Sequence, residues 1–222
     1  MFSQSLYRKY RPSNFNEVYG QTIAKKILIN SIDHAKISHA YLFFGPRGTG
    51  KTSIAKMFAR SVNCLAPVNG NCCEKCNNCL SSIDKNNVDI IEIDAASNNG
   101  VDEIRELRNK VNLVPNSLKY KVYIIDEVHM LSTGAFNALL KTLEEPPEHV
   151  IFILATTEIY KVPATIISRC QTIEFKNIDK KSMFERLSEI SKAENINITD
   201  DAINEIVQNS NGGLRDAIGL LE

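Results

Sequence analysis

Residues 45–52 read Gly45-Pro46-Arg47-Gly48-Thr49-Gly50-Lys51-Thr52 and match the pattern G-x-x-x-x-G-K-[ST]. This stretch follows an apolar run, His39–Phe44, and opens an amphipathic one, Lys51–Cys64. A strand, a glycine-rich turn and a helix in this order form a P-loop, whose backbone N–H groups surround phosphate oxygens at the helix N-terminus. Lys51 can reach the β- and γ-phosphates, and the Thr52 hydroxyl can ligate Mg²⁺. The sequence therefore predicts a nucleoside triphosphate site.

The surrounding pattern predicts an α/β fold. Short apolar runs alternate with amphipathic segments, which is typical of a parallel sheet covered by helices. The five expected strands are His39–Phe44, Asp89–Asp94, Lys121–Asp126, Val150–Thr156 and Cys170–Phe175. The expected helices among them are Gln21–Lys36, Lys51–Cys64, Val101–Val111 and Ser132–Leu143.

The pattern changes after Phe175. Asp179–Glu194, Thr199–Ser210 and Leu214–Leu221 have the periodicity of helices, and no apolar strand separates them. We therefore expect a nucleotide-binding domain over residues 1–177 and a small all-helical domain over residues 178–222. The last helix runs to the end of the sequence without a cap, so we expect that this second domain is truncated.

Charge is distributed unevenly, although 26 basic and 26 acidic residues cancel. Residues 1–60 hold ten Lys or Arg residues against two acidic ones, Glu17 and Asp33, which indicates that this part binds an anion. The longest apolar stretch, Val150–Ala155, is too short to span a bilayer, and residues 1–12 contain no apolar signal-peptide core. We expect a cytoplasmic protein without a membrane partner.

A second motif completes the expected chemistry. Asp126 and Glu127 end the apolar strand Lys121–Asp126, at the edge where a parallel sheet binds ligands. We expect Asp126 to hold Mg²⁺ through water, and Glu127 to position the attacking water and accept its proton. An acidic strand end is also common as a solvated turn, and the P-loop favours the catalytic interpretation. Thr157, at the end of the neighbouring strand, can bond the water or the γ-phosphate, although threonine is common at such positions.

The expected base is adenine. Guanine-specific P-loop proteins use an Asn-Lys-x-Asp element, and the nearest approach, Asn109-Lys110-Val111-Asn112, lacks the aspartate and lies on an expected helix. We therefore expect ATP with Mg²⁺.

Five of the six cysteines lie between residues 64 and 79. Cys64, Cys73, Cys76 and Cys79 follow the pattern C-x8-C-x2-C-x2-C, whose spacing suits a tetrahedral Zn²⁺ bound by four thiolates. Such a site has no open position, so the zinc would be structural and would stabilise an insertion. We assign Cys72 as a spare thiol. Reduced cysteines without metal remain the alternative.

Two arginines could pair with phosphate, namely Arg169 in Ser168-Arg169-Cys170 and Arg215 in Gly213-Leu214-Arg215-Asp216. Taken singly, each is more often a surface residue. The four histidines, at 34, 39, 129 and 149, show no ligand spacing and are interpreted as structural.

These motifs together resemble the clamp-loader AAA+ ATPases, and the cysteine module is similar to that of bacterial DNA polymerase III subunits of the γ/τ type. The resemblance covers essentially the whole chain. The matching elements include Tyr7–Pro12, Val18–Gln21, His39–Phe43, the P-loop, Asp126–Leu131, Asn137–Pro147, Ala155–Thr157, Ser168–Cys170 and Arg215–Ala217.

The resemblance implies an ATPase that, within a pentamer of clamp-loader subunits, loads a ring-shaped sliding clamp onto primed DNA in the bacterial cytoplasm, at the nucleoid-associated replisome. It implies that Thr157 is the sensor-1 residue, that Arg215 is the sensor-2 arginine of the helical lid, and that Arg169 enters a neighbour's site. It also places Arg8, Arg11, Pro12 and Val18 around the nucleotide.

Two other classes remain open from the sequence. The first is a nucleotide-binding scaffold without catalysis, which the intact Lys51, Thr52, Asp126 and Glu127 disfavour. The second is a P-loop motor that remodels DNA junctions or proteins, which the cysteine module and Ser168-Arg169-Cys170 disfavour. ATP hydrolysis by the assembled complex and binding of the clamp would separate these classes.

Overall fold

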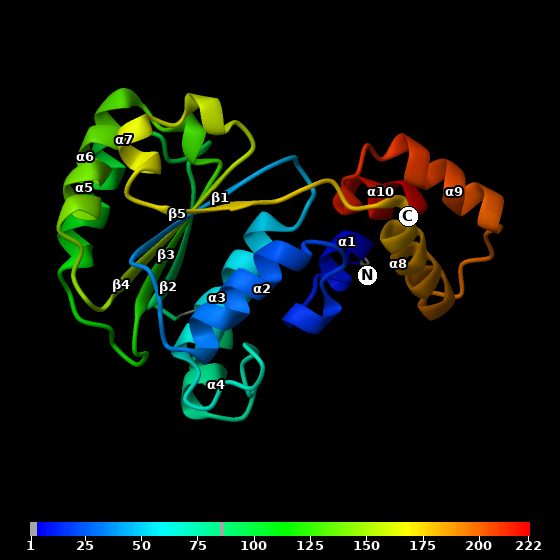
Figure 1. Ribbon diagram of the computed structural model, residues 1–222, viewed down its shortest axis with the longest axis horizontal. Helices are drawn as coiled ribbons and strands as arrows, with labels where there is room; N and C mark the ends of the chain where they lie inside the picture. Colours follow the sequence, from blue (N-terminus) through cyan, green and yellow to red (C-terminus); the bar gives the residue numbers. More distant parts are fainter. Residues whose placement is uncertain (1–3, 85–86) are drawn as a thin grey trace.

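The computed structural model describes residues 4–84 and 87–222 and shows an α/β layer followed by a bundle of helices (Figure 1). The strands are β1 (Ala40–Phe44), β2 (Ile90–Asp94), β3 (Lys121–Asp126), β4 (Val150–Thr156) and β5 (Gln171–Glu174). They form a parallel sheet in the order β2-β3-β4-β1-β5. The expected α/β fold with five parallel strands is confirmed, and each strand starts and ends within two residues of its expected bounds.

Helices connect and follow these strands. Those beside the sheet are α2 (Thr22–Asp33), α3 (Lys51–Asn63), α5 (Val101–Val111), α6 (Thr133–Glu144) and α7 (Ala164–Ile167). The remaining ones are α1 (Leu6–Lys9), α4 (Asn77–Ile83), α8 (Lys180–Ala193), α9 (Asp200–Asn209) and α10 (Leu214–Leu221), with 3₁₀ turns η1 (Phe15–Glu17), η2 (Val128–Met130) and η3 (Ile159–Lys161). Sequence periodicity did not predict α1, α4 and α7, because four to seven residues are too few to show it.

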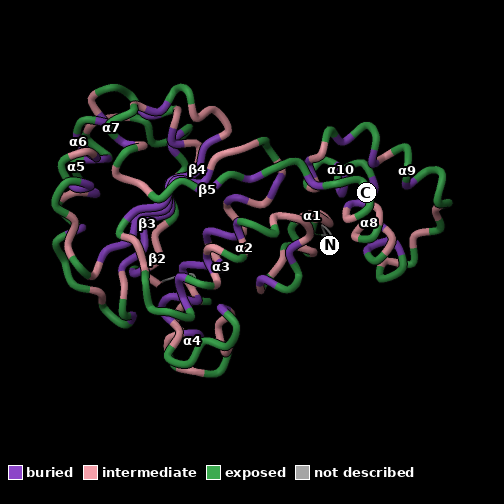
Figure 2. Tube along the Cα trace, viewed as in Figure 1, coloured by how far each residue is buried: buried purple, intermediate pink, exposed green. Residues whose placement is uncertain are grey.

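The central strands β1, β3 and β4 are buried on both faces (Figure 2). Successive residues of a strand point to opposite faces, so Tyr41 and Phe43 of β1 pack with α2 and α3 while Leu42 packs with α5 and α6. Every residue of β4 is buried. This double burial explains why the strands are continuous apolar runs in the sequence.

Local sequence signals set the ends of several elements. The hydroxyl of Ser132 accepts a hydrogen bond from the Ala135 amide and caps α6, which ends shortly before Pro146-Pro147. At the P-loop, Gly45 has a φ of 144°, and a Cβ there would lie 2.0 Å from the carbonyl oxygen of Phe175. Only glycine fits at this contact between the P-loop and the end of β5.

The helical region has its own hydrophobic core. Buried residues of α8, α9 and α10, such as Leu187, Ile203 and Ile218, pack together, and Tyr7 and Tyr10 of the N-terminal segment pack against them. The N-terminal segment therefore lies between the sheet layer and the bundle (Figure 1). Within the described ranges, no helix combines the length and the apolar character needed to cross a membrane.

Candidate active site and metal centre

A cavity of about 670 Å³ lies where the P-loop, the N-terminal segment and the helical bundle meet. This volume is in the range of small-molecule and cofactor sites. Its lining includes six basic residues, namely Arg8, Arg11, Arg47, Lys51, Arg186 and Arg215, and four acidic ones, namely Glu17, Glu92, Asp126 and Glu127. Four of the six basic residues belong to residues 1–60, the part in which basic residues are in excess.

The P-loop presents hydrogen-bond donors to this cavity. In the described part of the chain, the amide N–H groups of Gly48, Thr49 and Gly50 meet no protein acceptor, and all three residues line the cavity. Helix α3 starts directly after them, so its first amides lack intrahelical partners as well. Several aligned donors at the positive end of a helix suit a phosphate group.

Lys51 is the most deeply buried charged residue of the P-loop, with 6% of its surface exposed. Its Nζ donates to the carbonyl oxygens of Gly45 and Pro46, at 2.8 and 2.7 Å. Burial lowers the pKa of Lys51, and the neighbouring carboxylates Glu127 and Asp126 oppose that shift. Thr49 supports the same turn through a hydrogen bond of 2.8 Å to the Pro46 carbonyl.

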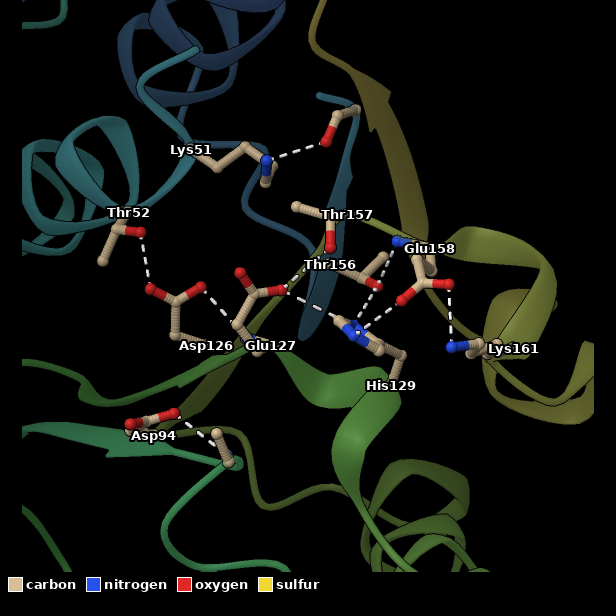
Figure 3. Close-up of polar contacts among 12 residues, drawn as sticks. Lys51, Thr52, Asp94, Asp126, Glu127, His129, Thr156, Thr157, Glu158 and Lys161 are labelled. Atoms are coloured by element: carbon tan, nitrogen blue, oxygen red, sulfur yellow. Dashed lines mark hydrogen bonds and ion pairs between the residues drawn. The ribbon is translucent and has the colours of Figure 1, made fainter. Parts of the chain in front are cut away.

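Thr52 and Asp126, which both line the cavity, contact each other (Figure 3). The Thr52 hydroxyl donates to Oδ2 of Asp126 at 2.6 Å, although 74 residues separate them in sequence. The contact forms because α3 starts and β3 ends at the same edge of the sheet. A hydroxyl and a carboxylate are hard oxygen donors of the kind that Mg²⁺ prefers, so this pair fits the expected ion.

Glu127 follows Asp126 in a left-handed backbone conformation, with φ 48°. Its amide donates to Oδ1 of Asp126 at 3.0 Å, and the Thr157 hydroxyl donates to its Oε2 at 3.2 Å. Thr157 itself is not among the described residues that line the cavity, and it contacts the site through its hydrogen bond to Glu127. The sequence predicted these three residues separately, and the adjacent ends of β3 and β4 bring them together.

His129, which the sequence analysis interpreted as structural, lies beside the expected catalytic residues. Its side chain is 6% exposed and lies beside Glu127, Thr156 and Glu158 (Figure 3). No ligand spacing in the sequence pointed to it, because its partners are on β4 and the following turn. Its only local signal is its position two residues after Glu127.

The N-terminal segment forms one wall of the cavity. Arg8, Arg11, Pro12 and Val18 all line it. The Nε of Arg11 donates to the Ser53 hydroxyl on α3 at 2.9 Å, which ties this wall to the P-loop helix.

The helical bundle also lines the cavity. Arg215 lines the cavity from α10, and its guanidinium lies 4.8 Å from the centre of the Tyr7 ring. Arg186 of α8 also lines it, and its guanidinium stacks against Tyr10 and Tyr19. Sequence reasoning found Arg215 and missed Arg186, because an arginine on an amphipathic helix carries no motif.

Arg169 lies outside the cavity, directly after α7. It pairs with Glu144 of α6 at 2.7 Å and donates to the Thr165 carbonyl at 2.8 Å. About a third of its side chain is exposed. The guanidinium therefore stands on the surface of the sheet layer, away from the Lys51 site.

The cysteine cluster forms between the end of α3 and α4. The Sγ atoms of Cys64, Cys73, Cys76 and Cys79 all lie within 4.8 Å of one another, and Cys72 is not part of this group among the described residues. Four thiolates bound at 2.3 Å to one tetrahedral ion would lie about 3.8 Å apart. The observed spacing, with Cys73 and Cys79 4.0 Å apart, therefore fits such an ion.

The backbone supports thiolates in this cluster. The Leu65 amide is the main cause that lowers the pKa of Cys76 to about 6, and the Lys75 amide lowers that of Cys73. Burial raises the pKa of Cys64 and of Cys79. A dication would offset that burial cost, because it favours the deprotonated thiol.

Comparison with protein families gives two matches. Residues 20–179 match the family described as "DNA polymerase III, delta subunit". Residues 185–222 match "RCF1/5-like, AAA+ ATPase lid domain".

Individual relatives cover nearly the whole chain. DNA polymerase III subunit tau of Bacillus subtilis is 56% identical over all of this chain and 39% of the relative. Subunit gamma/tau of Mycoplasma genitalium is 48% identical over 99% of this chain and 37% of the relative. Subunit gamma of Buchnera aphidicola (subsp. Baizongia pistaciae) is 46% identical over 98% of this chain and 59% of the relative. The chain therefore spans between about two fifths and three fifths of the length of these relatives.

A solved structure shows the same architecture. The RuvB Holliday junction branch migration motor of Thermotoga maritima matches with a TM-score of 0.69 and 22% identity, over 96% of this chain and 64% of that one. A structural likeness at 22% sequence identity shows the fold alone, and the AAA+ character of the helical lid comes from the family match over residues 185–222.

Proposed function

Because the chain belongs to the DNA polymerase III subunit family matched over residues 20–179, we propose that it is the ATP-hydrolysing part of a clamp-loader subunit of the gamma/tau type. Its ATP binding and hydrolysis would drive the loading of a sliding clamp onto primed DNA. The relatives named gamma and tau, at 46–56% identity, support this assignment.

One observation carries the enzymatic part of this proposal. Lys51, Thr52, Asp126 and Glu127 come from two separate segments and converge on one cavity with a basic lining. Each has the functional group that P-loop phosphoryl transfer requires at that place. A scaffold that only binds nucleotide would not need a carboxylate such as Glu127 beside the phosphate site.

The chain's own groups would divide the work as follows. The amides of Gly48, Thr49 and Gly50 and the ammonium of Lys51 bind the phosphates. Thr52 and Asp126 would hold Mg²⁺, which neutralises phosphate charge when bound. Glu127 orients the attacking water and accepts its proton, and Thr157 holds Glu127 in place.

The remaining lining residues would bind the rest of the nucleotide. Arg8, Arg11, Pro12 and Val18 would surround the base and sugar, and Arg215 would approach the phosphates from the lid. The proposed domains are residues 1–177 and 178–222, and their separate hydrophobic cores support this division. Nucleotide bound between them would contact both, so its turnover would change their relative orientation.

Lys51→Ala is expected to abolish ATP binding. The substitution removes a buried cation whose neighbours are the P-loop carbonyls and the site's carboxylates, so nothing replaces its attraction for phosphate. Titration of the full-length protein with a fluorescent ATP analogue measures the change. Lys26→Ala, which removes an exposed lysine outside the cavity lining, is the matched control for loss of a lysine side chain. Wild-type affinity in Lys51→Ala would contradict the site.

The cysteine cluster is proposed as a structural zinc site. The Sγ spacing and the N–H donors to Cys64 and Cys76, at 3.2 and 3.4 Å, support a closed thiolate site. No residue of the cluster lines the cavity, so the ion would stabilise the α3–α4 insertion without taking part in hydrolysis.

One zinc per chain is expected in protein purified without chelator. Cys73→Ser should lose the metal and lower the stability of the insertion, because metal-binding energy is folding energy in such a site. Cys72→Ser is the matched control and should retain the metal. The zinc content per chain, measured together with the number of free thiols, tests this expectation. If Cys72→Ser loses the zinc and Cys73→Ser retains it, the ligand assignment is wrong.

The proposed partners are other clamp-loader subunits in a pentamer, the sliding clamp and primed DNA, in the bacterial cytoplasm at the nucleoid. The test is ATP hydrolysis by the assembled full-length protein, with and without clamp and primed DNA. Stimulation only when both are present is expected. Stimulation by branched DNA without a clamp would instead favour a junction motor, the activity named for the RuvB structure.

A further inference from the structure

The carboxylate of Glu127 has two close side-chain neighbours. Thr157 donates to its Oε2 at 3.2 Å, and Nδ1 of His129 lies 3.5 Å from the same oxygen (Figure 3). Two groups from different elements thus meet at one oxygen. The side chain of Glu127 is 35% exposed. Without these two neighbours, the carboxylate would contact mainly water and could change rotamer.

The His129 ring links this oxygen to the end of β4. Its Nδ1 lies 3.0 Å from the Thr156 hydroxyl, which is fully buried. The Glu158 amide donates to the same hydroxyl at 3.0 Å, and the Thr156 carbonyl accepts from the Gly45 amide of the P-loop at 3.3 Å. The ring is therefore anchored to the strand that also supports the P-loop.

The other side of the ring faces a second carboxylate. Nε2 of His129 lies 3.3 Å from Oε1 of Glu158. Glu158 is in turn held by Lys161 at 2.8 Å and by the Tyr160 hydroxyl. The hydrogen bond from Lys161 lowers the pKa of Glu158, so this carboxylate is ionised and fixed.

We propose that His129 is a positioning residue for ATP hydrolysis, which bridges Glu158 and Thr156 to the carboxylate of Glu127 and holds that carboxylate toward the attacking water. This inference rests on the proposed function. A neutral imidazole has one donor nitrogen and can donate to only one of the two carboxylates, whereas an imidazolium has two donor nitrogens and can donate to both. A buried histidine with only a packing role would not need its two nitrogens directed at carboxylates of two separate segments.

The consequence is an effect on turnover and not on affinity. The ring is not among the residues that line the cavity, so its removal leaves the phosphate-binding groups in place. Small displacements of a catalytic group cost up to about 10²-fold in rate. We therefore expect His129→Ala to lower the single-turnover rate by about 10-fold to 100-fold, with ATP affinity within about threefold of wild type.

Two conservative variants separate positioning from packing. His129→Asn keeps a polar group where Nδ1 meets Thr156 and Glu127, and His129→Gln keeps one where Nε2 meets Glu158. Because the Nδ1 side contacts Glu127, Asn should restore more of the rate than Gln. The matched control is His149→Ala, because the His149 ring has one hydrogen-bond contact within the described residues, to the Val111 carbonyl at 3.1 Å, and lies outside the cavity. It should keep the wild-type rate.

The experiment measures single-turnover hydrolysis, affinity for a fluorescent ATP analogue and the unfolding midpoint, all in the assembled full-length protein. A wild-type rate in His129→Ala would overturn the inference. So would a lower rate accompanied by equal losses of affinity and stability without recovery in His129→Asn, since that pattern marks a packing role. Absence of hydrolysis in the wild-type protein would overturn the proposed function, and this inference with it.

Discussion

Arg169→Ala is expected to reduce ATP hydrolysis by the assembled protein by about 10³–10⁵-fold, the range that an arginine supplied to a phosphoryl-transfer site contributes. The guanidinium lies on the surface beside α6 and outside the cavity that contains Lys51. We therefore expect it to act on ATP bound by a neighbouring subunit. The steady-state rate at saturating ATP measures the loss, and ATP affinity measured separately should stay near wild type.

A mixture of two mutants tests whether the action is between subunits. A complex that contains both Arg169→Ala and Lys51→Ala subunits has sites in which an intact Lys51 faces an intact Arg169, and these should regain turnover. Glu144→Gln is the control, because it removes the ion pair of Arg169 within its own chain. If Glu144→Gln reproduces the full loss, or if the mixture stays inactive, Arg169 serves its own subunit's structure.

Glu127→Gln is expected to bind ATP like the wild-type protein and to hydrolyse it about 10²–10⁴-fold more slowly, the usual contribution of a general base. The amide keeps the size of the carboxylate and can still accept from Thr157, but it cannot take a proton from water. Binding should survive because the phosphate contacts come from the P-loop. Rapid-quench measurement of a single turnover separates the two steps.

A surface carboxylate provides the control for Glu127. Glu106→Gln changes the same functional group on α5, where Glu106 pairs with Lys110 at 3.7 Å. It should leave the rate unchanged. Hydrolysis by Glu127→Gln at the wild-type rate would show that another group accepts the proton, and the catalytic assignment would then be wrong.

Sequence reasoning reached the residues that belong to short continuous motifs. Residues 45–52 form one continuous loop. Its backbone requires glycine at position 45, because φ is positive there and a side chain would collide with Phe175. Asp126 and Glu127 end an apolar strand, and the position of a strand end follows from the parallel α/β pattern. The four cysteines of the cluster lie within 16 residues of one another, so their spacing alone indicates that their thiols can come together.

Residues whose contacts join distant segments of the chain could not be predicted from the sequence. His129 and Arg186 carry no motif, and each contacts partners that the fold brings near. For His129 these are Thr156 and Glu158, and for Arg186 they are Tyr10 and Tyr19. A single sequence contains no signal for such pairs, because either partner alone is an ordinary residue of a helix or a turn.

The sequence by itself determined the α/β class, the P-loop, the acidic strand end and the cysteine cluster, because backbone conformation and period are local properties of the chain. Only the tertiary structure decided which separate segments share the cavity. The strand order β2-β3-β4-β1-β5 places the ends of β3 and β4 side by side. The packing of Tyr7 and Tyr10 on the helical bundle brings the N-terminal arginines to the same cavity as Arg215. Both arrangements form because each helix or strand has an apolar face that it can bury only against other elements. Which faces pack together therefore depends on the whole chain and not on any single segment.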